Sequence, residues 1–498
     1  MIKKTASGFR LIFGYLGLFI AFVGVVMLLP LFAFIAFPKE AGDWYCFLIP
    51  GLSAIVLGVG LFLLIANRPK AQLGKNQDSV LLVLVWLTAI FISAVPFLVK
   101  GNWTFTNAIF ETTSAYATIG LTVFDEADLQ LHAFVLYRSL LSFVGGVGLV
   151  LIITSAISDR YGLKLYLAEG HNDKLMPQLA KSARIIFSIY TGITLLGVLL
   201  YSLAGMPVFD AIIHSVSGVA TAGFSSRPQG IMAFSNLNSF WAIQLISIFL
   251  MVSGATNFLL TFFIITGRFK KAFKDCEMRL FGCLVLIFVP VFTLAAFFGG
   301  DGLTFGQAFV QGSFTFISAI TTTGFSNVES ITKLGEGVLF LVTIINIIGG
   351  GIGSTAGGVK QYRLAITLKS LHWSVKENTA ANNIIFPHFI SRFGEDKEVT
   401  QQDIANANGY IVLYVILMFI GGLLVTLFNK GESNFGHSLF EFSNAISSTG
   451  LSFGIYKYRP LGVKWTLIAG MFAGRLEILA IYYALARVFK DIFRKETY

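Results

Sequence analysis

Long apolar stretches recur along the whole chain, separated by short polar segments. About 20 apolar residues, each rising 1.5 Å along a helix, span the roughly 30 Å hydrocarbon core of a bilayer. Seven uncharged stretches approach or exceed that length: residues 11–37, 47–66, 80–99, 185–204, 241–266, 280–298 and 411–428. The first follows three basic residues as in a signal peptide, but it is far longer than such a peptide's apolar core of about 7–15 residues. We therefore predict a retained span there and an all-α integral membrane protein.

A short polar phrase interrupts this pattern four times. Its copies contain a small or hydroxyl residue, Thr or Ser, any residue, Gly, Leu or Phe, and Thr or Ser: residues 117–122, 220–225, 321–326 and 447–452. Each copy follows a moderately apolar segment of about 10–14 residues, too short to cross a bilayer. These segments predict re-entrant half-helices: residues 107–116, 209–219, 308–320 and 438–446.

Full spans flank each of these half-helices, so the chain is predicted to contain four repeats of one unit, M1–pore loop–M2, around a pseudo-fourfold pore. The predicted second spans are residues 131–157, 241–266, 338 onward and 463–489. The predicted divisions are two extra N-terminal transmembrane helices (1–75), unit 1 (76–165), unit 2 (181–275), unit 3 (276–370), a cytoplasmic connection (371–403) and unit 4 (404–498). Ten crossings place both termini on the same side of the membrane.

The basic residues indicate which side that is. The net charge is +10, and only 12% of the residues are charged against 55% hydrophobic ones. If the chain starts inside, 26 of its 36 lysines and arginines lie in cytoplasmic segments, which is the positive-inside bias of membrane proteins. The charge thus predicts a bilayer as partner and no nucleic acid, with cytoplasmic termini.

The four phrases carry the candidate chemistry. Non-helical backbone at membrane depth is tolerated only where it is buried in protein or lines water, so four such segments belong around one axis. Their carbonyl oxygens could replace the hydration shell of a cation, and their glycines permit positive φ and remove a crowding Cβ. A single copy could equally be a polar loop that caps a helix. Four copies in register between spans favour a pore.

These motifs resemble the Trk/Ktr/HKT superfamily of potassium transporters, whose fold is four such units in one polypeptide. The two extra N-terminal spans are similar to the TrkH/TrkG-type branch, since Ktr-type subunits usually lack them. The resemblance implies a potassium selectivity filter, and Gly at the first position favours potassium because plant relatives that pass sodium often have Ser there. The implied filter segments are Thr118, Ile119 and Gly120; Thr221, Ala222 and Gly223; Thr322, Thr323 and Gly324; and Ser448, Thr449 and Gly450, with K⁺ bound at Thr118, Thr221, Thr322 and Ser448.

A glycine-rich loop (residues 349–360) interrupts the predicted second span of unit 3. Its six glycines fall within ten residues: Gly349, Gly350, Gly351, Gly353, Gly357 and Gly358. It is not a phosphate-binding P-loop, because Val359 rather than Lys follows Gly358 and no strand is predicted before it. A simple hinge in the helix is one reading. The resemblance implies a gate beneath the filter that blocks the pore and moves aside on activation.

Arg475 lies in the last predicted span, where a charge is costly and usually faces a cavity or a partner. An ion pair with Glu441 or with another unit's carboxylate is one explanation. The resemblance instead implies that Arg475 lies just below the filter, opposes inward ion passage and contacts the gate. Arg138 and Glu111 are expected to pair and support the first filter, and Glu441 to brace the fourth.

Other classes of function lack their motifs. An intramembrane enzyme would need a nucleophile with a base or a metal site at membrane depth, such as paired Asp, Ser with Lys, or a His-Glu-x-x-His run, and the sequence contains none. A carrier built on inverted repeats would have halves of opposite topology, whereas these four units all run the same way. A non-conducting scaffold would have no use for four re-entrant glycine turns.

The resemblance also implies partners and a location. It implies a homodimer in the bacterial cytoplasmic (inner) membrane and a cytosolic nucleotide-binding TrkA-like regulatory subunit docked on the basic face. The transported ion would be K⁺, with no organic cofactor in this chain. Whether uptake is passive or coupled to protons or sodium is left open.

Overall fold

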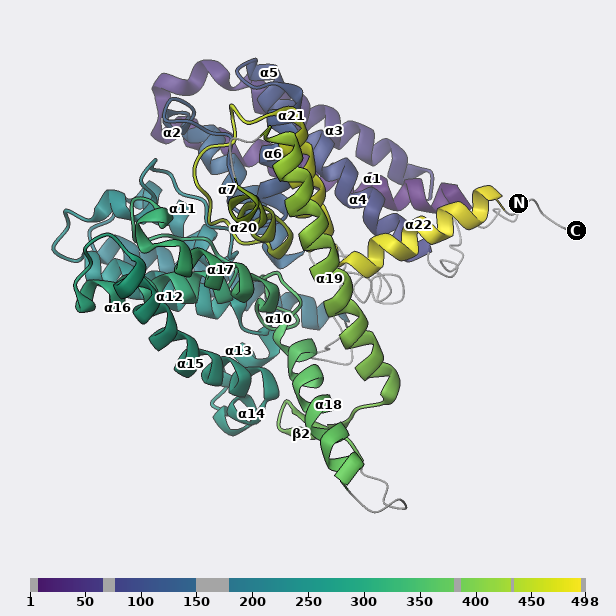
Figure 1. Ribbon diagram of the computed structural model, residues 1–498. Coiled ribbons are helices and arrows are strands. Elements are labelled where there is room, and N and C mark those ends of the chain that lie inside the picture. The colour runs from purple at the N-terminus through teal and green to yellow at the C-terminus, as the bar shows by residue number, and fades with distance from the viewer. Residues whose placement is uncertain (1–7, 66–76, 149–178, 380–386, 431–433, 494–498) are drawn as a thin grey trace, which may run out of the picture.

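The structure is a computed structural model of the 498-residue chain and describes residues 8–65, 77–148, 179–379, 387–430 and 434–493 (Figure 1). Its described part is almost wholly helical, with one antiparallel hairpin of β1 (Phe389–Arg392) and β2 (Glu395–Glu398). By length and composition, six of the described helices could cross a membrane, or eight if each of two bent pairs counts as one span.

Two N-terminal helices, α1 (Gly8–Leu28) and α3 (Tyr45–Leu63), pack closely against each other. Glycines permit this approach, as in many membrane helix pairs. A Cβ on Gly17 would lie 2.5 Å from the carbonyl oxygen of Gly58, and one on Gly58 would lie 2.4 Å from the backbone nitrogen of Ala21. Short helical turns, η1 (Leu29–Phe32), α2 (Ala33–Ala36) and η2 (Pro38–Asp43), connect the pair.

Four units of the same order follow. Unit 1 contains α4 (Gln77–Ser93), α5 (Val95–Lys100), α6 (Phe105–Tyr116), η3 (Asp128–Gln130) and α7 (His132–Val147). Unit 2 contains α10 (Leu179–Leu203), α11 (Val208–Val219), η4 (Gly230–Phe234), α12 (Phe240–Ala255) and α13 (Phe258–Ile265). Each unit thus has a long first helix, a short pore helix and a second helix.

The second pair of units keeps this order. After α14 (Phe269–Lys274), unit 3 contains α15 (Cys276–Gly299), α16 (Phe305–Ile320), η5 (Ile331–Leu334), α17 (Glu336–Ile348) and α18 (Gln361–Thr379). Unit 4 contains α19 (Gln401–Phe428), α20 (Phe435–Ser447), α21 (Leu461–Arg475) and α22 (Ile478–Phe493). The final helix returns to the start of the repeats, because α22 contacts α4 (Figure 1).

The pore helices α6, α11, α16 and α20 begin at local signals in the sequence. Thr104 and Thr304 accept hydrogen bonds from backbone nitrogens in the first turns of α6 and α16, and Asn434 does the same for α20. Pro207 precedes α11, where its fixed φ suits a helix start. All four helices therefore start near the positions expected from the sequence.

The second helices differ from the unbroken spans that hydropathy alone suggests. The chain bends by 116° between α12 and α13 and by 99° between α21 and α22. The first bend is fixed by Asn257, whose side chain caps α13, and the second contains Glu477 in a left-handed conformation. In unit 1, α7 ends at Val147, and the rest of the predicted span 131–157 lies outside the described residues.

The predicted connection at residues 371–403 has structure of its own. It contains the end of α18 and the hairpin, so the predicted boundary at residue 370 falls inside a helix. The hairpin is attached to the helical body through buried contacts. The backbone nitrogen of Phe393 donates to Asp275 over 2.9 Å, and the Arg392 guanidinium lies 4.1 Å from the centre of the Tyr362 ring.

Candidate ion pathway

The four filter segments adopt one backbone conformation. Their first residues have left-handed φ angles of 53° (Thr118), 51° (Thr221), 52° (Thr322) and 61° (Ser448), which is uncommon for residues with a Cβ and strained for Thr. In every unit the next backbone nitrogen donates to a carbonyl five residues earlier in the pore helix: Ile119 to Ser114, Ala222 to Ser217, Thr323 to Ser318 and Thr449 to Asn444. One backbone geometry thus occurs in all four units.

The filter glycines bring the four segments together in a closed ring. A Cβ on Gly120 would lie 2.3 Å from the carbonyl oxygen of Ala222, and one on Gly223 would lie 2.3 Å from that of Thr323. A Cβ on Gly324 would lie 2.4 Å from the nitrogen of Gly450, and one on Gly450 would lie 2.1 Å from the carbonyl oxygen of Ile119. Each unit therefore touches the next through backbone, and no side chain fits at these positions.

A cavity of about 510 Å³ lies on the side of this ring away from the glycine-rich loop, and all four filter glycines line it. Hydroxyl residues that follow the glycines also line it, namely Thr122, Ser225, Ser326 and Ser452. The side chains of Ile119, Ala222, Thr323 and Thr449 are buried away from solvent. Because the pore helices point their C-terminal ends at the ring, their partial negative charge favours cations there.

The glycine-rich loop lies directly against the inner side of the filter segments. The backbone nitrogen of Gly357 donates to the hydroxyl of Thr322 over 2.8 Å. The hydroxyls of Thr355 and Thr221 are 3.1 Å apart, and Thr355 also donates to the carbonyl oxygens of Val219 and Gly254. The cavity on this side has only about 30 Å³, so the loop fills most of the space beneath the ring.

Other contacts hold the loop from below. The loop's two ends are tied together where the backbone nitrogen of Gln361 donates to the Gly350 carbonyl over 2.9 Å. Glu277, only 2% exposed, accepts a hydrogen bond from the backbone nitrogen of Ile352 over 2.8 Å. The roles of Thr355 and Glu277 were not predicted from the sequence. A hydroxyl residue inside a glycine-rich loop could have indicated Thr355 as a hydrogen-bonding residue.

Arg475 contacts this loop, as the resemblance implies. Its Nη1 donates to the carbonyl oxygen of Thr355 over 3.2 Å, and its Nη2 donates to the carbonyls of Gly145 and Gly146 at the end of α7. No ion pair joins Arg475 to Glu441 in the described residues. Glu477, two residues on, instead pairs with Arg363 of α18 at 2.7 Å. The alternative of an Arg475–Glu441 pair is wrong.

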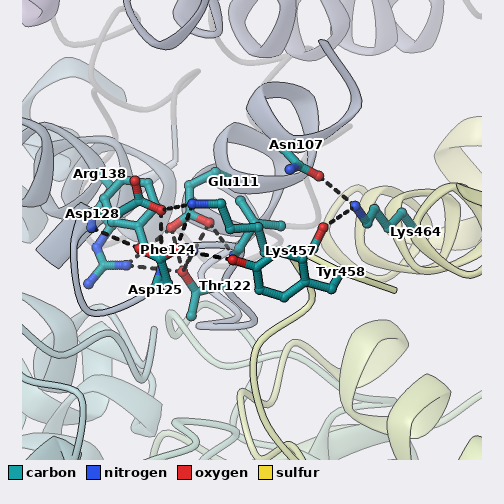
Figure 2. Close-up of polar contacts among 11 residues, drawn as sticks. Asn107, Glu111, Thr122, Phe124, Asp125, Asp128, Arg138, Lys457, Tyr458 and Lys464 are labelled. Atoms are coloured by element: carbon teal, nitrogen blue, oxygen red, sulfur yellow. Dashed lines mark hydrogen bonds and ion pairs between the residues drawn. The ribbon is translucent and has the colours of Figure 1, made fainter. Parts of the chain in front are cut away.

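Arg138 and Glu111 form the predicted ion pair in unit 1, with Arg138 Nη1 3.2 Å from Glu111 Oε1 (Figure 2). Both side chains are almost fully buried. Glu111 also accepts hydrogen bonds from Thr122 and from the backbone nitrogen of Val123, just after the first filter. The Arg138 guanidinium reaches the carbonyl oxygen of Ser225, so it connects the backbones that follow the first and second filters.

A second cluster in Figure 2 connects the outer loops of units 1 and 4. Lys457 Nζ lies 2.7 Å from Asp125 and 2.9 Å from Asp128. Partial burial opposes ionisation of Asp125, but the hydrogen bond and charge of Lys457 outweigh it and lower the Asp125 pKa to about 2. Tyr456, beside Lys457, donates its backbone nitrogen to the Thr122 carbonyl over 2.9 Å. Sequence reasoning missed this cluster, because its partners are more than 300 residues apart.

The described residues contain no group of three His, Cys, Asp or Glu side chains that could hold a metal ion. Asp125, Glu126 and Glu329 add carboxylates to the wall of the large cavity, while the ring itself offers a cation carbonyl and hydroxyl oxygens as donors. Such donors suit a weakly held monovalent ion, which must leave as readily as it binds.

Comparisons with known proteins agree with this architecture. The family model described as "TrkH: Cation transport protein" matches residues 47–491. An uncharacterized cation transporter of Methanocaldococcus jannaschii is 28% identical over 99% of this chain and 98% of its own length. The Trk system potassium uptake protein TrkH of Salmonella typhimurium is 28% identical over 95% of this chain and 97% of its own. The crystal structure of the potassium transporter TrkH from Vibrio parahaemolyticus superimposes with a TM-score of 0.82 at 26% identity, covering 97% of this chain and 100% of that one.

Proposed function

Because this chain belongs to the TrkH family of cation transport proteins, we propose that it takes up potassium ions through a gated, channel-like pore on the common axis of its four units. The potassium uptake proteins among its relatives match nearly its whole length, which supports the same substrate here.

The observation that carries the proposal is the closed ring of filter backbones. Four glycines line one cavity, and each glycine abuts the backbone of the next unit. Carbonyl oxygens held at such short range around an axis can replace the hydration shell of a bare cation. We assign the binding of K⁺ to the carbonyls of Thr118, Thr221, Thr322 and Ser448 and their neighbours.

The glycine-rich loop is the proposed gate. It lies beneath the ring and is hydrogen-bonded to the hydroxyls of two filter residues, Thr221 and Thr322. Its glycines let the backbone pack tightly, since a Cβ on Gly357 would lie 2.0 Å from the carbonyl oxygen of Ser447. In this arrangement the inner path is closed. Opening then requires the loop to leave these contacts while Arg475 keeps a positive charge beside the exit.

The proposed setting rests on the resemblance drawn from the sequence motifs. We place the protein in a cytoplasmic membrane with both termini inside, as a homodimer controlled by a cytosolic nucleotide-binding TrkA-like subunit. The basic cytoplasmic segments and the buried attachment of the hairpin near α15 support a docking face on that side.

Growth of a bacterium that lacks potassium uptake tests the proposal. We expect this gene to restore growth at low external potassium, and a Gly324→Ser variant to lower the discrimination between potassium and sodium. Equal expression in the membrane fraction controls for folding. A well-expressed wild-type protein that moves no potassium, with or without its partner, contradicts the function.

A further inference from the structure

One position in the pore helices differs among the units in a way that changes the local charge. Nine residues before the filter glycine stand Glu111, His214, Thr315 and Glu441 in units 1 to 4. All but Glu441 are fully buried, and Glu441 is 7% exposed. Two of the four units therefore place a carboxyl group behind the filter.

The second helices can be aligned through three glycines. A Cβ on Gly145, Gly254 or Gly474 would lie 2.0–2.2 Å from a pore-helix carbonyl, and in each case that carbonyl belongs to the residue four before the filter glycine. Seven residues before these glycines stand Arg138 in unit 1, Ser247 in unit 2 and Leu467 in unit 4. Unit 4 therefore has leucine where unit 1 has the arginine that pairs with Glu111.

At this position, units 1 and 2 provide partners for the buried side chain. Arg138 neutralises Glu111. His214 bonds through Nδ1 to the Asp210 carbonyl and through Nε2 to the hydroxyl of Ser225. Both ring nitrogens of His214 therefore have partners within unit 2. No positive charge is required in unit 2.

Unit 4 is different because its carboxylate lacks a matched partner. Glu441 Oε1 accepts a hydrogen bond from the backbone nitrogen of Phe453 over 3.2 Å, just after the fourth filter. Among the described residues, no donor reaches the buried Oε2. Burying an ionised carboxylate without compensation costs several kcal/mol, so a counter-charge or a proton is needed there.

A cavity of about 110 Å³ lies beside Glu441; none of the filter glycines lines it, and it shares Phe453 with the large cavity at the ring. Tyr456 lines the same cavity, and its buried hydroxyl also has no hydrogen-bond partner among the described residues. Asn429 and Ser438 add polar groups to its wall. The space suffices for an ion with a few water molecules.

We propose that this cavity binds a monovalent cation, held by Glu441 Oε2 and the Tyr456 hydroxyl, which supplies in unit 4 the positive charge that Arg138 supplies in unit 1. The ion would reach the cavity from its partly exposed rim, where Phe453 and His437 lie. Because Glu441 holds the backbone of Phe453, the ion fixes the segment that follows the fourth filter. Filter order then depends on the cation in this cavity as well as on ions in the pore.

Arg459 is the competing source of positive charge, since it also lines the cavity. Its charge acts on the Glu441 carboxylate, but no salt bridge joins the two described side chains, and Arg459 is only half-buried. A rearranged Arg459 would neutralise the carboxylate without any ion, and it would fill part of the cavity. The experiment therefore has to separate an ion from a guanidinium.

Thallium(I) is a suitable probe, because it is a monovalent cation with strong anomalous scattering. The full-length protein would be crystallised with Tl⁺ as wild type and as Glu441→Gln, in which the amide keeps the shape and loses the charge. We expect anomalous density within about 3 Å of Glu441 Oε2 in the wild type, the distance of a direct oxygen contact. The variant should lose that peak and keep the peaks at the filter.

A Tyr456→Phe variant provides a second test in case Glu441→Gln folds poorly, with weaker density expected in the cavity. Filter peaks without a cavity peak, or an Arg459 guanidinium against Oε2, overturn this inference and leave the proposed function intact. Absence of the filter peaks alone would count against the proposed function instead.

Discussion

The guanidinium of Arg475 lies 3.2 Å from the carbonyl oxygen of Thr355, so a charge from the last unit holds the loop that closes unit 3. The same side chain reaches the end of α7 in unit 1. One arginine therefore joins three units directly beneath the filter. Its removal should affect the closed state more than the fold.

We accordingly expect Arg475→Ala to raise potassium flux, because both the latch on Thr355 and the positive charge at the pore exit are lost. Charge-assisted hydrogen bonds contribute about 1.5–3 kcal/mol each, enough for roughly a tenfold shift in an open–closed equilibrium. Potassium flux into proteoliposomes that contain the variant measures this shift. Arg268→Ala, at an exposed position, is the matched control. Unchanged flux in a well-folded Arg475→Ala protein would refute the latch.

Thr355→Val tests the loop without altering charge. Valine keeps the volume of threonine but removes the hydroxyl that donates to the carbonyls of Val219 and Gly254. Since each lost hydrogen bond costs about 1 kcal/mol, we expect several-fold higher basal flux. Thr379→Val, at the exposed end of α18, should leave flux unchanged. Equal flux in both variants would mean that the loop does not limit conduction.

Gly120→Ala should abolish selective uptake. Its Cβ would lie 2.3 Å from the Ala222 carbonyl oxygen, and the φ of 89° at this position disfavours alanine. Gly60→Ala is the matched control, because nothing lies within 4 Å of a Cβ there. Rescue of growth at low potassium and the ratio of potassium to sodium flux are the readouts. A Gly120→Ala protein with normal selectivity would rule out the tight ring.

Arg138→Met should destabilise the protein by about 3–5 kcal/mol, because it leaves the Glu111 carboxylate buried without its partner. The double variant Arg138→Met with Glu111→Gln should recover much of that loss, since the uncompensated charge is gone. Thermal unfolding in detergent provides both values. A double variant no more stable than the single one would show that Arg138 acts through packing on Phe124 and Phe224 rather than through charge.

The Asp125–Lys457 pair should make the outer face acid-sensitive. The Asp125 pKa is lowered from 3.8 to about 2, so the folded state favours the ionised form. Its stabilisation is fully present above about pH 4 and is lost as the pH falls toward 2. The pair is partly exposed, so we expect less than about 1 kcal/mol. Lys457→Met should make the free energy of unfolding less dependent on pH in this range. An unchanged dependence on pH would contradict the pairing.

Much of this architecture could be predicted because it is repeated. The half-helices, the filter segments and the glycine-rich loop were each visible as local patterns, and the Arg138–Glu111 pair followed from two charges at membrane depth. The bends after α12 and α21 were not predicted, since hydropathy is blind to a cap such as Asn257 inside an apolar run. The contacts of Thr355, Glu277 and Lys457 depend on tertiary packing of distant segments, which spacing along the chain does not encode.

The ring of filter glycines is closed within a single polypeptide, so its four quarters are specified by four separate codons. In a homotetrameric channel one substitution alters every quarter at once. Here the filter segment of each unit can change independently, and a single substitution leaves the other three segments unaltered. Ion preference in such a protein can therefore evolve in small steps, through sequence differences that arise among its own repeats.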